Sequence, residues 1–266
     1  MATRRKRERG AAAADLFLKR IAVVPPADGE KRTAHPFDLP AIQLLRERAF
    51  TAPVTVFVGE NGMGKSTLLE AIAVHLGLNP EGGSRNLHFA TKATHSALHA
   101  ALRVVRGAKR PRDAYFLRAE SFYNVASELD AIDADPDNVM YNSGPPVLDG
   151  YGSRSLHEQS HGESFFALFL NRFRGHGLYL LDEPEAALSP QRQLALLVRM
   201  HELVHAGSQF VLATHSPLLM AYPGCDVWSF TETGIAKTAA ADTDHWRITK
   251  RFLSDPEGML RELLAD

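Results

Sequence analysis

The sequence predicts an α/β protein with a mostly parallel sheet flanked by helices. Three short apolar runs, Val54–Val58, Leu178–Leu181 and Gln209–Ala213, have the length and composition of buried strands. Segments with helical spacing, Ser66–Leu76 and Pro190–His205, follow the first two of these runs. Strands that alternate with helices favour a parallel sheet covered on both faces.

The remaining elements and the domain organisation follow from periodicity and composition. We expect strands at Leu16–Val24 and Tyr115–Leu117, and helices at Ala41–Ala49, Ser96–Val105, Ser160–Phe173 and Thr243–Leu264, the last interrupted by Pro256. Residues 1–14 are expected to be a disordered basic tail, with a nucleic-acid-binding arm as the alternative. Residues 15–266 are expected to form one domain with a helical or lid insertion at about 77–175.

Composition limits the class of protein. The chain of 266 residues is 45% hydrophobic and carries a net charge of -1, so it can bury a core and is not a polycation. The basic residues between Arg103 and Arg118 are either a solvated rim or a path for DNA or RNA. One cysteine, Cys225, allows no internal disulfide, and no apolar run is long enough to span a membrane, so we expect a cytoplasmic protein.

A glycine-rich segment joins the first buried strand to its helix and has the spacing of a phosphate-binding loop. Glycines let the backbone wrap around phosphates, and the helix that follows directs its positive N-terminal dipole at them. Lys65 is expected to reach the β and γ phosphates, and the Ser66 hydroxyl to hold Mg²⁺. The expected nucleotide-binding residues are Gly59, Glu60, Asn61, Gly62, Met63, Gly64, Lys65, Ser66 and Thr67.

Two acidic residues end the strand at Leu178–Leu181. Asp182 is placed to hold Mg²⁺, directly or through water, and Glu183 to polarise the water that attacks the γ-phosphate. An ordinary turn before Pro184 is the alternative. The upstream phosphate loop favours the catalytic interpretation.

A helix start and a histidine complete the set of motifs. Ser160, with Glu163 three residues later, makes a capping box, and Gly162 between them suits a close approach of the backbone to a ligand. The alternative is a well-capped helix without a ligand. His215 follows the buried strand Gln209–Ala213, where a lone histidine is more often structural.

Taken together, these motifs resemble the ABC-ATPase superfamily, whose signature usually reads Leu-Ser-Gly-Gly-Gln. Residues 159–163 occupy those places and keep the serine and the second glycine. The resemblance implies a P-loop NTPase of ABC-ATPase head type, with an antiparallel N-terminal portion and a helical signature subdomain. It also implies an ATPase in which His215 contacts the γ-phosphate, while Ser160 and Gly162 act on the ATP of a second copy in an ATP-dependent homodimer. The implied cofactors are ATP and Mg²⁺.

The motif Glu183-Pro-Glu-x-x-Leu-x-Pro190 resembles the corresponding segment of stand-alone predicted bacterial ATPases and of the ATPase heads of OLD-family and RecF/SMC-like proteins. About fifty residues follow His215, too few for a Toprim nuclease domain, and no sustained heptads precede Ser160. Where the family has its Q-loop glutamine this chain has Glu120, and we expect Glu120 or Ser121 to touch Mg²⁺ or water, with an exposed strand end as the alternative. The implied role is gating of a DNA-repair or defence effector. Action on protein partners and energising of a transporter are the alternatives.

Two His-Glu-x-x-His strings, at residues 157–161 and 201–205, have the spacing of a zinc peptidase. The first overlaps the signature helix, and the second lies on a helix between two core strands. Neither has an identifiable third ligand. We therefore expect no zinc chemistry.

Overall fold

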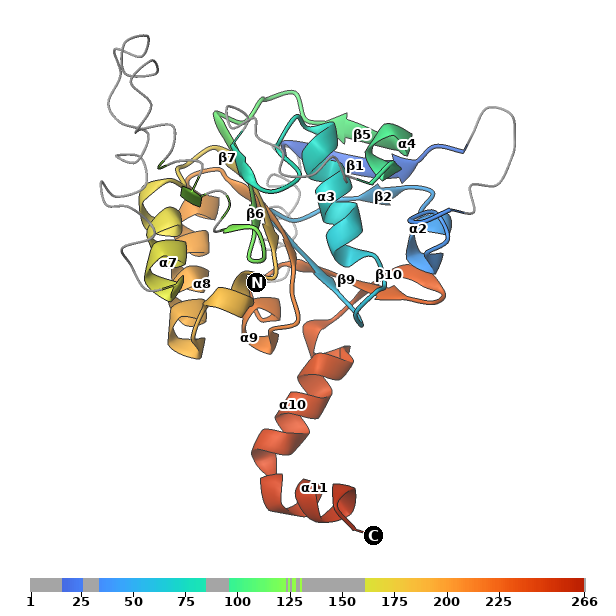
Figure 1. Ribbon diagram of the computed structural model, residues 1–266, viewed down its shortest axis with the longest axis vertical. Coiled ribbons are helices and arrows are strands. Elements are labelled where there is room, and N and C mark those ends of the chain that lie inside the picture. Colours follow the sequence, from blue (N-terminus) through green and yellow to red (C-terminus); the bar gives the residue numbers. More distant parts are fainter. Residues whose placement is uncertain are drawn as a thin grey trace, which may run out of the picture.

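A computed structural model describes residues 16–25, 34–84, 96–122, 124, 126–127, 130 and 161–265 (Figure 1). Within these residues the main sheet has seven strands in the order β10-β9-β3-β8-β7-β6-β4. Their bounds are β3 (Val54–Val58), β4 (Gly83–Ser84), β6 (Asp113–Arg118), β7 (Gly177–Asp182), β8 (Gln209–Ala213), β9 (Asp226–Thr231) and β10 (Gly234–Thr238). The five central strands are parallel, and β4 and β10 pair antiparallel at the edges. The α/β class predicted from the sequence is confirmed.

A second, antiparallel sheet has the order β2-β1-β5, formed by β1 (Leu18–Val23), β2 (Arg48–Ala49) and β5 (Leu102–Arg106). It brings the N-terminal strand β1 beside β5, which lies more than seventy residues later in the chain. The Gln209 side chain of β8 ties this sheet to the main one, because its amide bonds both the backbone N–H and the C=O of Leu18 at 2.9 Å. The expected antiparallel N-terminal portion is therefore present.

Helices cover both faces of the main sheet (Figure 1). One face carries α7 (His161–Asn171), α8 (Pro190–His205) and α9 (Pro217–Met220), packed over buried aromatic rings such as Phe169, Phe173 and Tyr179. The other face carries α2 (Pro40–Gln43), α3 (Lys65–His75) and α4 (Leu98–Ala101), together with the antiparallel sheet. Every residue of β3, β7 and β8 is buried, which is the pattern of strands covered on both faces.

Three expectations differ from the structure. The segment expected as a helix at Ala41–Ala49 contains α2 and then β2, and Ser96–Val105 contains α4 and then β5. In both cases pairing with β1 overrides local helical spacing, and the β-branched Val104 and Val105 suit the strand. The range 77–175 expected as an insertion also contains β6, which lies inside the main sheet.

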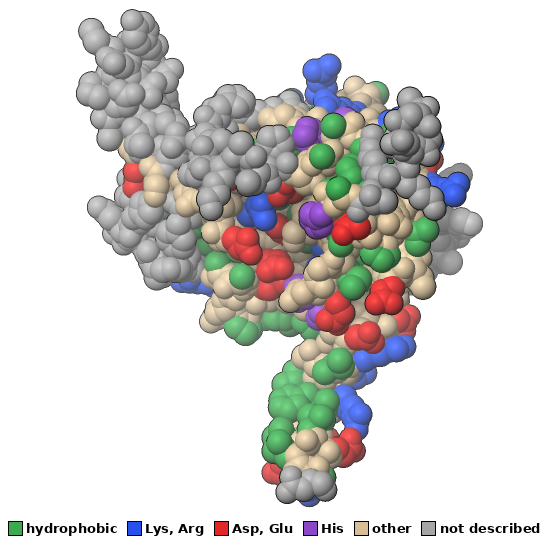
Figure 2. Space-filling view, turned by 45° about the vertical axis from the view of Figure 1, so that its right-hand side comes forward, with side chains coloured by type: hydrophobic (Ala, Val, Ile, Leu, Met, Phe, Trp, Pro, Cys, Tyr) green, Lys and Arg blue, Asp and Glu red, His purple; other side chains and the backbone are tan. Residues whose placement is uncertain are grey.

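The chain ends in two helices, α10 (Asp244–Ser254) and α11 (Pro256–Leu263), which extend away from the body of the protein as an arm (Figure 1). Asp255 separates them and caps α11, since its carboxylate accepts a hydrogen bond from the Gly258 N–H at 2.9 Å. Neither helix contains a buried residue, and apolar side chains are visible along the arm in Figure 2. The break expected at Pro256 is confirmed.

Among the described residues no helix has both the length and the apolar character needed to cross a membrane.

Candidate nucleotide site

The carboxyl ends of the parallel strands lie along one edge of the sheet. The glycine-rich loop follows β3, Asp182 ends β7, and Thr214-His215 follows β8. Ligands of open parallel sheets bind outside this edge. The structure thus brings the predicted phosphate loop, the acidic pair and the histidine to one place.

The loop between β3 and α3 needs glycine at three positions. Gly59, Gly62 and Gly64 have φ of 141°, 79° and 90°, a region in which residues with a side chain are strained. Gly59 is also restricted by space, because a Cβ there would lie 2.4 Å from the carbonyl oxygen of Phe230 on β9. Gly64 precedes α3 without any side-chain cap, so the first N–H groups of that helix remain for a ligand.

Lys65 is the first residue of α3, and its side chain reaches back across this loop. Its Nζ donates to the carbonyl oxygens of Gly59 and Glu60 at 2.8 and 2.9 Å, and the residue is buried. Burial lowers the pKa of Lys65, and the nearby carboxylates of Glu183 and Asp182 oppose that shift. The Lys65 side chain therefore holds the loop in a curve and places its amino group beside the loop carbonyls.

Asp182 is buried at the end of β7, and its Oδ1 has no hydrogen-bond partner. Burial raises the pKa of Asp182 to about 6, although a hydrogen bond from Ser66 and the charge of Arg118 act in the opposite direction. An orphaned carboxylate oxygen beside a serine hydroxyl is the donor set that Mg²⁺ uses at phosphate sites. The residues present therefore fit a magnesium ion.

Glu183 has an unusual backbone for a residue with a side chain, with φ 49° and ψ 50°. This conformation turns the chain out of β7, while the Glu183 N–H donates to the Ala213 carbonyl at 2.9 Å. Its carboxylate is 40% exposed and lies 3.7 Å from Nε2 of His215. Strain of this kind is typical of functional sites, and here it directs the carboxylate at the histidine.

Two neighbours hold His215. Its backbone N–H donates to Glu185 Oε1 at 2.6 Å, and its Nδ1 lies 2.9 Å from Nε2 of His245 at the start of α10. Burial, assisted by the charges of Lys65 and His245, lowers the pKa of His215, which favours the neutral ring. Its Nε2 is buried and has no hydrogen-bond partner. The ring is thus held at Nδ1, while Nε2, on the side of Glu183, makes no hydrogen bond.

The other predicted site residues lie around the loop, at the protein surface or outside the described residues. Asn61 and Gly62 are exposed at the tip of the loop, Met63 packs against the core beneath it, and Thr67 is half-buried in the first turn of α3. Glu120 is 85% exposed, 3.8 Å from the Arg118 guanidinium, and its contact with Mg²⁺ stays a prediction. Ser160 lies outside the described residues. Gly162 lies in the first turn of α7, next to Glu163, whose carboxylate lies 3.6 Å from the Arg192 guanidinium.

Sequence reasoning missed three residues of the site. Arg118 was assigned to a basic surface, but its guanidinium pairs with Glu70 at 2.8 Å and lies 3.5 Å from Asp182. Its place at the end of a predicted strand was the available signal. Glu185 belonged to a quoted motif without a role. His245, which follows His215 by thirty residues, carried no sequence signal at all.

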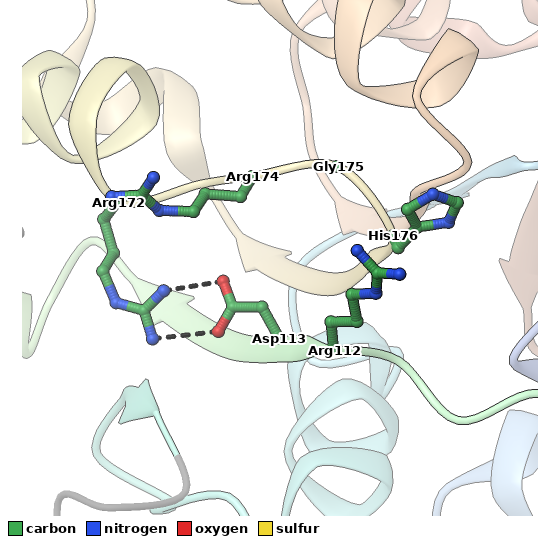
Figure 3. Close-up of a pocket in the computed structure, with 6 residues that line it drawn as sticks. All are labelled: Arg112, Asp113, Arg172, Arg174, Gly175 and His176. Atoms are coloured by element: carbon green, nitrogen blue, oxygen red, sulfur yellow. Dashed lines mark hydrogen bonds and ion pairs between the residues drawn. The ribbon is translucent and has the colours of Figure 1, made fainter.

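A second feature lies at the opposite edge of the sheet, where β6 and β7 begin. A pocket of about 480 Å³ is lined by Arg112, Asp113, Arg172, Arg174, Gly175 and His176 (Figure 3). Arg172 binds both carboxylate oxygens of Asp113, at 2.6 and 2.9 Å. No acidic group among the described residues forms an ion pair with Arg112 or Arg174, so the pocket has a surplus of positive charge. The described part of the chain contains no cluster of three potential metal ligands.

The predicted basic region is therefore divided between two edges. Arg118, at the end of β6, lies six positions after Arg112, which at about 3.3 Å per residue is roughly 20 Å. Arg118 belongs to the nucleotide site, and Arg112 belongs to the pocket at the opposite edge of the sheet, which we call the distal pocket. Arg118 therefore lies apart from the solvated rim or nucleic-acid path that was expected for the basic residues between Arg103 and Arg118.

Comparison with known proteins identifies related families. Residues 84–221, just over half of the chain, match a family model described as "AAA domain, putative AbiEii toxin, Type IV TA system", and residues 42–110 match one described as "AAA domain". A search of curated proteins finds no match.

Solved structures with a similar course of the chain include ATP-binding cassettes of ABC transporters and an SMC head domain. They include cbiO1 from Clostridium perfringens, part of an ABC transporter complex (17% identity, 93% of this chain, 99% of that chain, TM-score 0.49), and the SMC head domain from Thermotoga maritima (15%, 84%, 99%, 0.42). An ABC transporter cassette in its ADP conformation is also similar (17%, 94%, 99%, 0.45). At these low scores, the fold assignment depends on strand order and loop geometry.

Proposed function

The chain belongs to the AAA-domain family described as "AAA domain, putative AbiEii toxin, Type IV TA system", and on that premise we propose that it is an ATPase that binds ATP with Mg²⁺ and hydrolyses it. The strongest support for this proposal is that predicted site residues from separate parts of the chain lie close together. Lys65, Asp182 and His215, from three separate strand ends, lie at one edge of the sheet around a loop shaped for phosphate.

Each group has a chemical task in this proposal. Lys65 and the loop amides bind the phosphates, and Ser66 with Asp182 would hold Mg²⁺, which supplies charge neutralisation at the phosphates. Glu183 accepts a proton from the attacking water, and His215 contacts the γ-phosphate. Ser160 and Gly162 would come from a second copy, so the active unit is an ATP-dependent homodimer.

The test is Mg²⁺-dependent release of phosphate from ATP by the purified protein, beside a Lys65→Ala variant. We expect turnover by the wild-type protein. The variant should bind ATP at least about tenfold more weakly, because a buried cation at the phosphates is lost. Absence of turnover in the wild-type protein at any Mg²⁺ concentration would overturn the assignment.

For the biological role we favour gating of a DNA-repair or defence effector over action on protein partners or energising of a transporter. The distal pocket favours a nucleic-acid partner. Arg112 and Arg174 present guanidinium groups at an open pocket, and guanidinium groups bind phosphate in a two-pronged geometry (Figure 3). Asp113 does not offset these charges, because Arg172 already neutralises it.

We expect DNA to stimulate the ATPase, and the double variant Arg112→Glu/Arg174→Glu to lose that stimulation while the basal rate is unchanged. The matched control reverses two exposed arginines elsewhere, Arg46 and Arg261, and should keep the stimulation. Binding to a labelled duplex should weaken steeply with added salt. Equal stimulation of both double variants would remove the pocket from the nucleic-acid path, and co-purification of a protein with no response to DNA would favour the protein-partner role.

A further inference from the structure

Among the described residues, His245 is the component of the nucleotide site that the C-terminal arm supplies. It is the second residue of α10, and its Nε2 lies 2.9 Å from Nδ1 of His215, with the two ring centroids 4.9 Å apart. At that distance the two nitrogens share a proton, so one ring donates and the other accepts. The identity of the donor decides which nitrogen of His215 carries hydrogen.

The surroundings of His215 select one arrangement. Its other nitrogen, Nε2, faces the Glu183 carboxylate at 3.7 Å, and both Glu183 and Glu60 stabilise positive charge on the ring. If His215 donated from Nδ1, a lone pair on Nε2 would face the carboxylate. If His245 donates, His215 presents Nε2–H to the carboxylate, which is the electrostatically favourable pairing.

The base of α10 is held firmly enough to fix this contact. Thr243 is buried, caps the helix by accepting from the Trp246 N–H at 3.4 Å, and donates to the Ala240 carbonyl at 2.7 Å. It also contacts the sulfur of Met220 on α9, the short helix that follows His215. One packed unit therefore carries both histidines.

We propose that His245 is a positioning residue that holds His215 in the Nε2–H tautomer, so that a hydrogen-bond donor faces Glu183 and the γ-phosphate of bound ATP. The part played by the γ-phosphate rests on the proposed function. A ring whose tautomer is fixed by the partner of its other nitrogen is pre-oriented for its task. The arm thereby takes part in the ATP site through its first turn.

The first experiment measures the tautomer directly, on the full chain labelled with ¹⁵N-histidine. The imidazole nitrogens of His215, assigned from a His215→Phe sample, should show a protonated Nε2 and an unprotonated Nδ1 in the wild-type protein. His245→Phe keeps a ring but removes the donor, and should give a mixture of tautomers. A wild-type His215 protonated on Nδ1 would overturn the inference, whether or not the protein is an ATPase.

The second experiment separates positioning from folding. We expect His245→Phe to lower kcat by about 10-fold to 100-fold with unchanged affinity for ATP. His245→Gln, whose amide nitrogen can occupy the place of Nε2 and donate, should restore most of the rate. The control His205→Phe removes a histidine on α8 that bonds the His201 carbonyl of its own helix, and should change nothing.

Equal kcat in His245→Phe and wild type, or no recovery in His245→Gln despite a wild-type unfolding midpoint, would overturn the positioning role. Failure of the wild-type protein to hydrolyse ATP would overturn the proposed function instead, and the tautomer measurement would still decide between the two hydrogen-bond arrangements.

Discussion

Glu183→Gln is expected to lower ATP turnover by about 100-fold to 10,000-fold while ATP binding is retained, because the variant loses only the group that accepts the proton of the attacking water. The amide has the size of the carboxylate and can keep the strained backbone at φ 49°. It cannot accept a proton at neutral pH. Glu183 follows β7 and is not part of the phosphate loop, so the loop groups expected to bind ATP are unchanged in the variant.

The variant should also capture the dimer. If hydrolysis separates the two copies, ATP added to Glu183→Gln will double the apparent mass in size-exclusion chromatography, and ADP will not. Glu202→Gln is a suitable control, since Glu202 is an exposed carboxylate on α8 that pairs with Arg199. Full hydrolysis by Glu183→Gln, in a preparation free of contaminating ATPase, would refute the assigned role of Glu183.

Asp182→Asn is expected to stabilise the nucleotide-free protein and to abolish the effect of Mg²⁺ on ATP binding and turnover. The folded-state pKa of Asp182 is raised to about 6, above the ordinary value of 3.8. Above pH 6 the folded chain must hold a buried carboxylate in its charged form, whereas the unfolded chain ionises it in water. Ionised Asp182 therefore destabilises the fold at neutral pH, by about 1–3 kcal/mol.

Because the pKa of Asp182 is raised in the folded state, its destabilising effect depends on pH. The penalty is complete above pH 6, falls as the pH drops from 6 towards 3.8, and is absent below 3.8, so the advantage of the asparagine should shrink over that window. At pH 7.5 the unfolding midpoint should rise by a few degrees, at about 2–4 °C per kcal/mol. Scanning calorimetry at pH 7.5 and pH 5 measures both effects.

Asp113→Asn provides the contrasting control for this stability measurement. Asp113 accepts two hydrogen bonds from Arg172 and one from the Tyr179 hydroxyl at 3.1 Å, so its ionised form is paired. Its substitution should lower the unfolding midpoint. An Asp182→Asn protein that melts at or below the wild-type temperature at pH 7.5 would contradict the claim that the buried, ionised Asp182 carboxylate destabilises the fold.

The parts of the fold that were predictable are those in which local pattern and tertiary environment agree. Strand β3 and helix α8 have the bounds expected. The short apolar run of β3 is buried throughout, and the long amphipathic run of α8 buries one face, so in both the local pattern matches the tertiary surroundings. Strand β5 was mistaken for helix, since its partner β1 lies far away in sequence. The hairpin β9-β10 was not anticipated, because β9 mixes buried and partly buried positions and the edge strand β10 has only two buried residues, so neither has a clear apolar pattern.

Some residues of the nucleotide site were likewise predictable from the sequence, and others were not. The sequence by itself determined the phosphate loop, because the glycine conformations, Lys65 and the helix start are all contained in one short segment. It also indicated Asp182, Glu183 and His215, since each directly follows a recognisable buried strand. Only the tertiary structure decided that Arg118 lies beside Asp182 and that His245 meets His215, because side-chain contacts between distant strand ends and a terminal helix depend on packing, which leaves no local pattern in the chain.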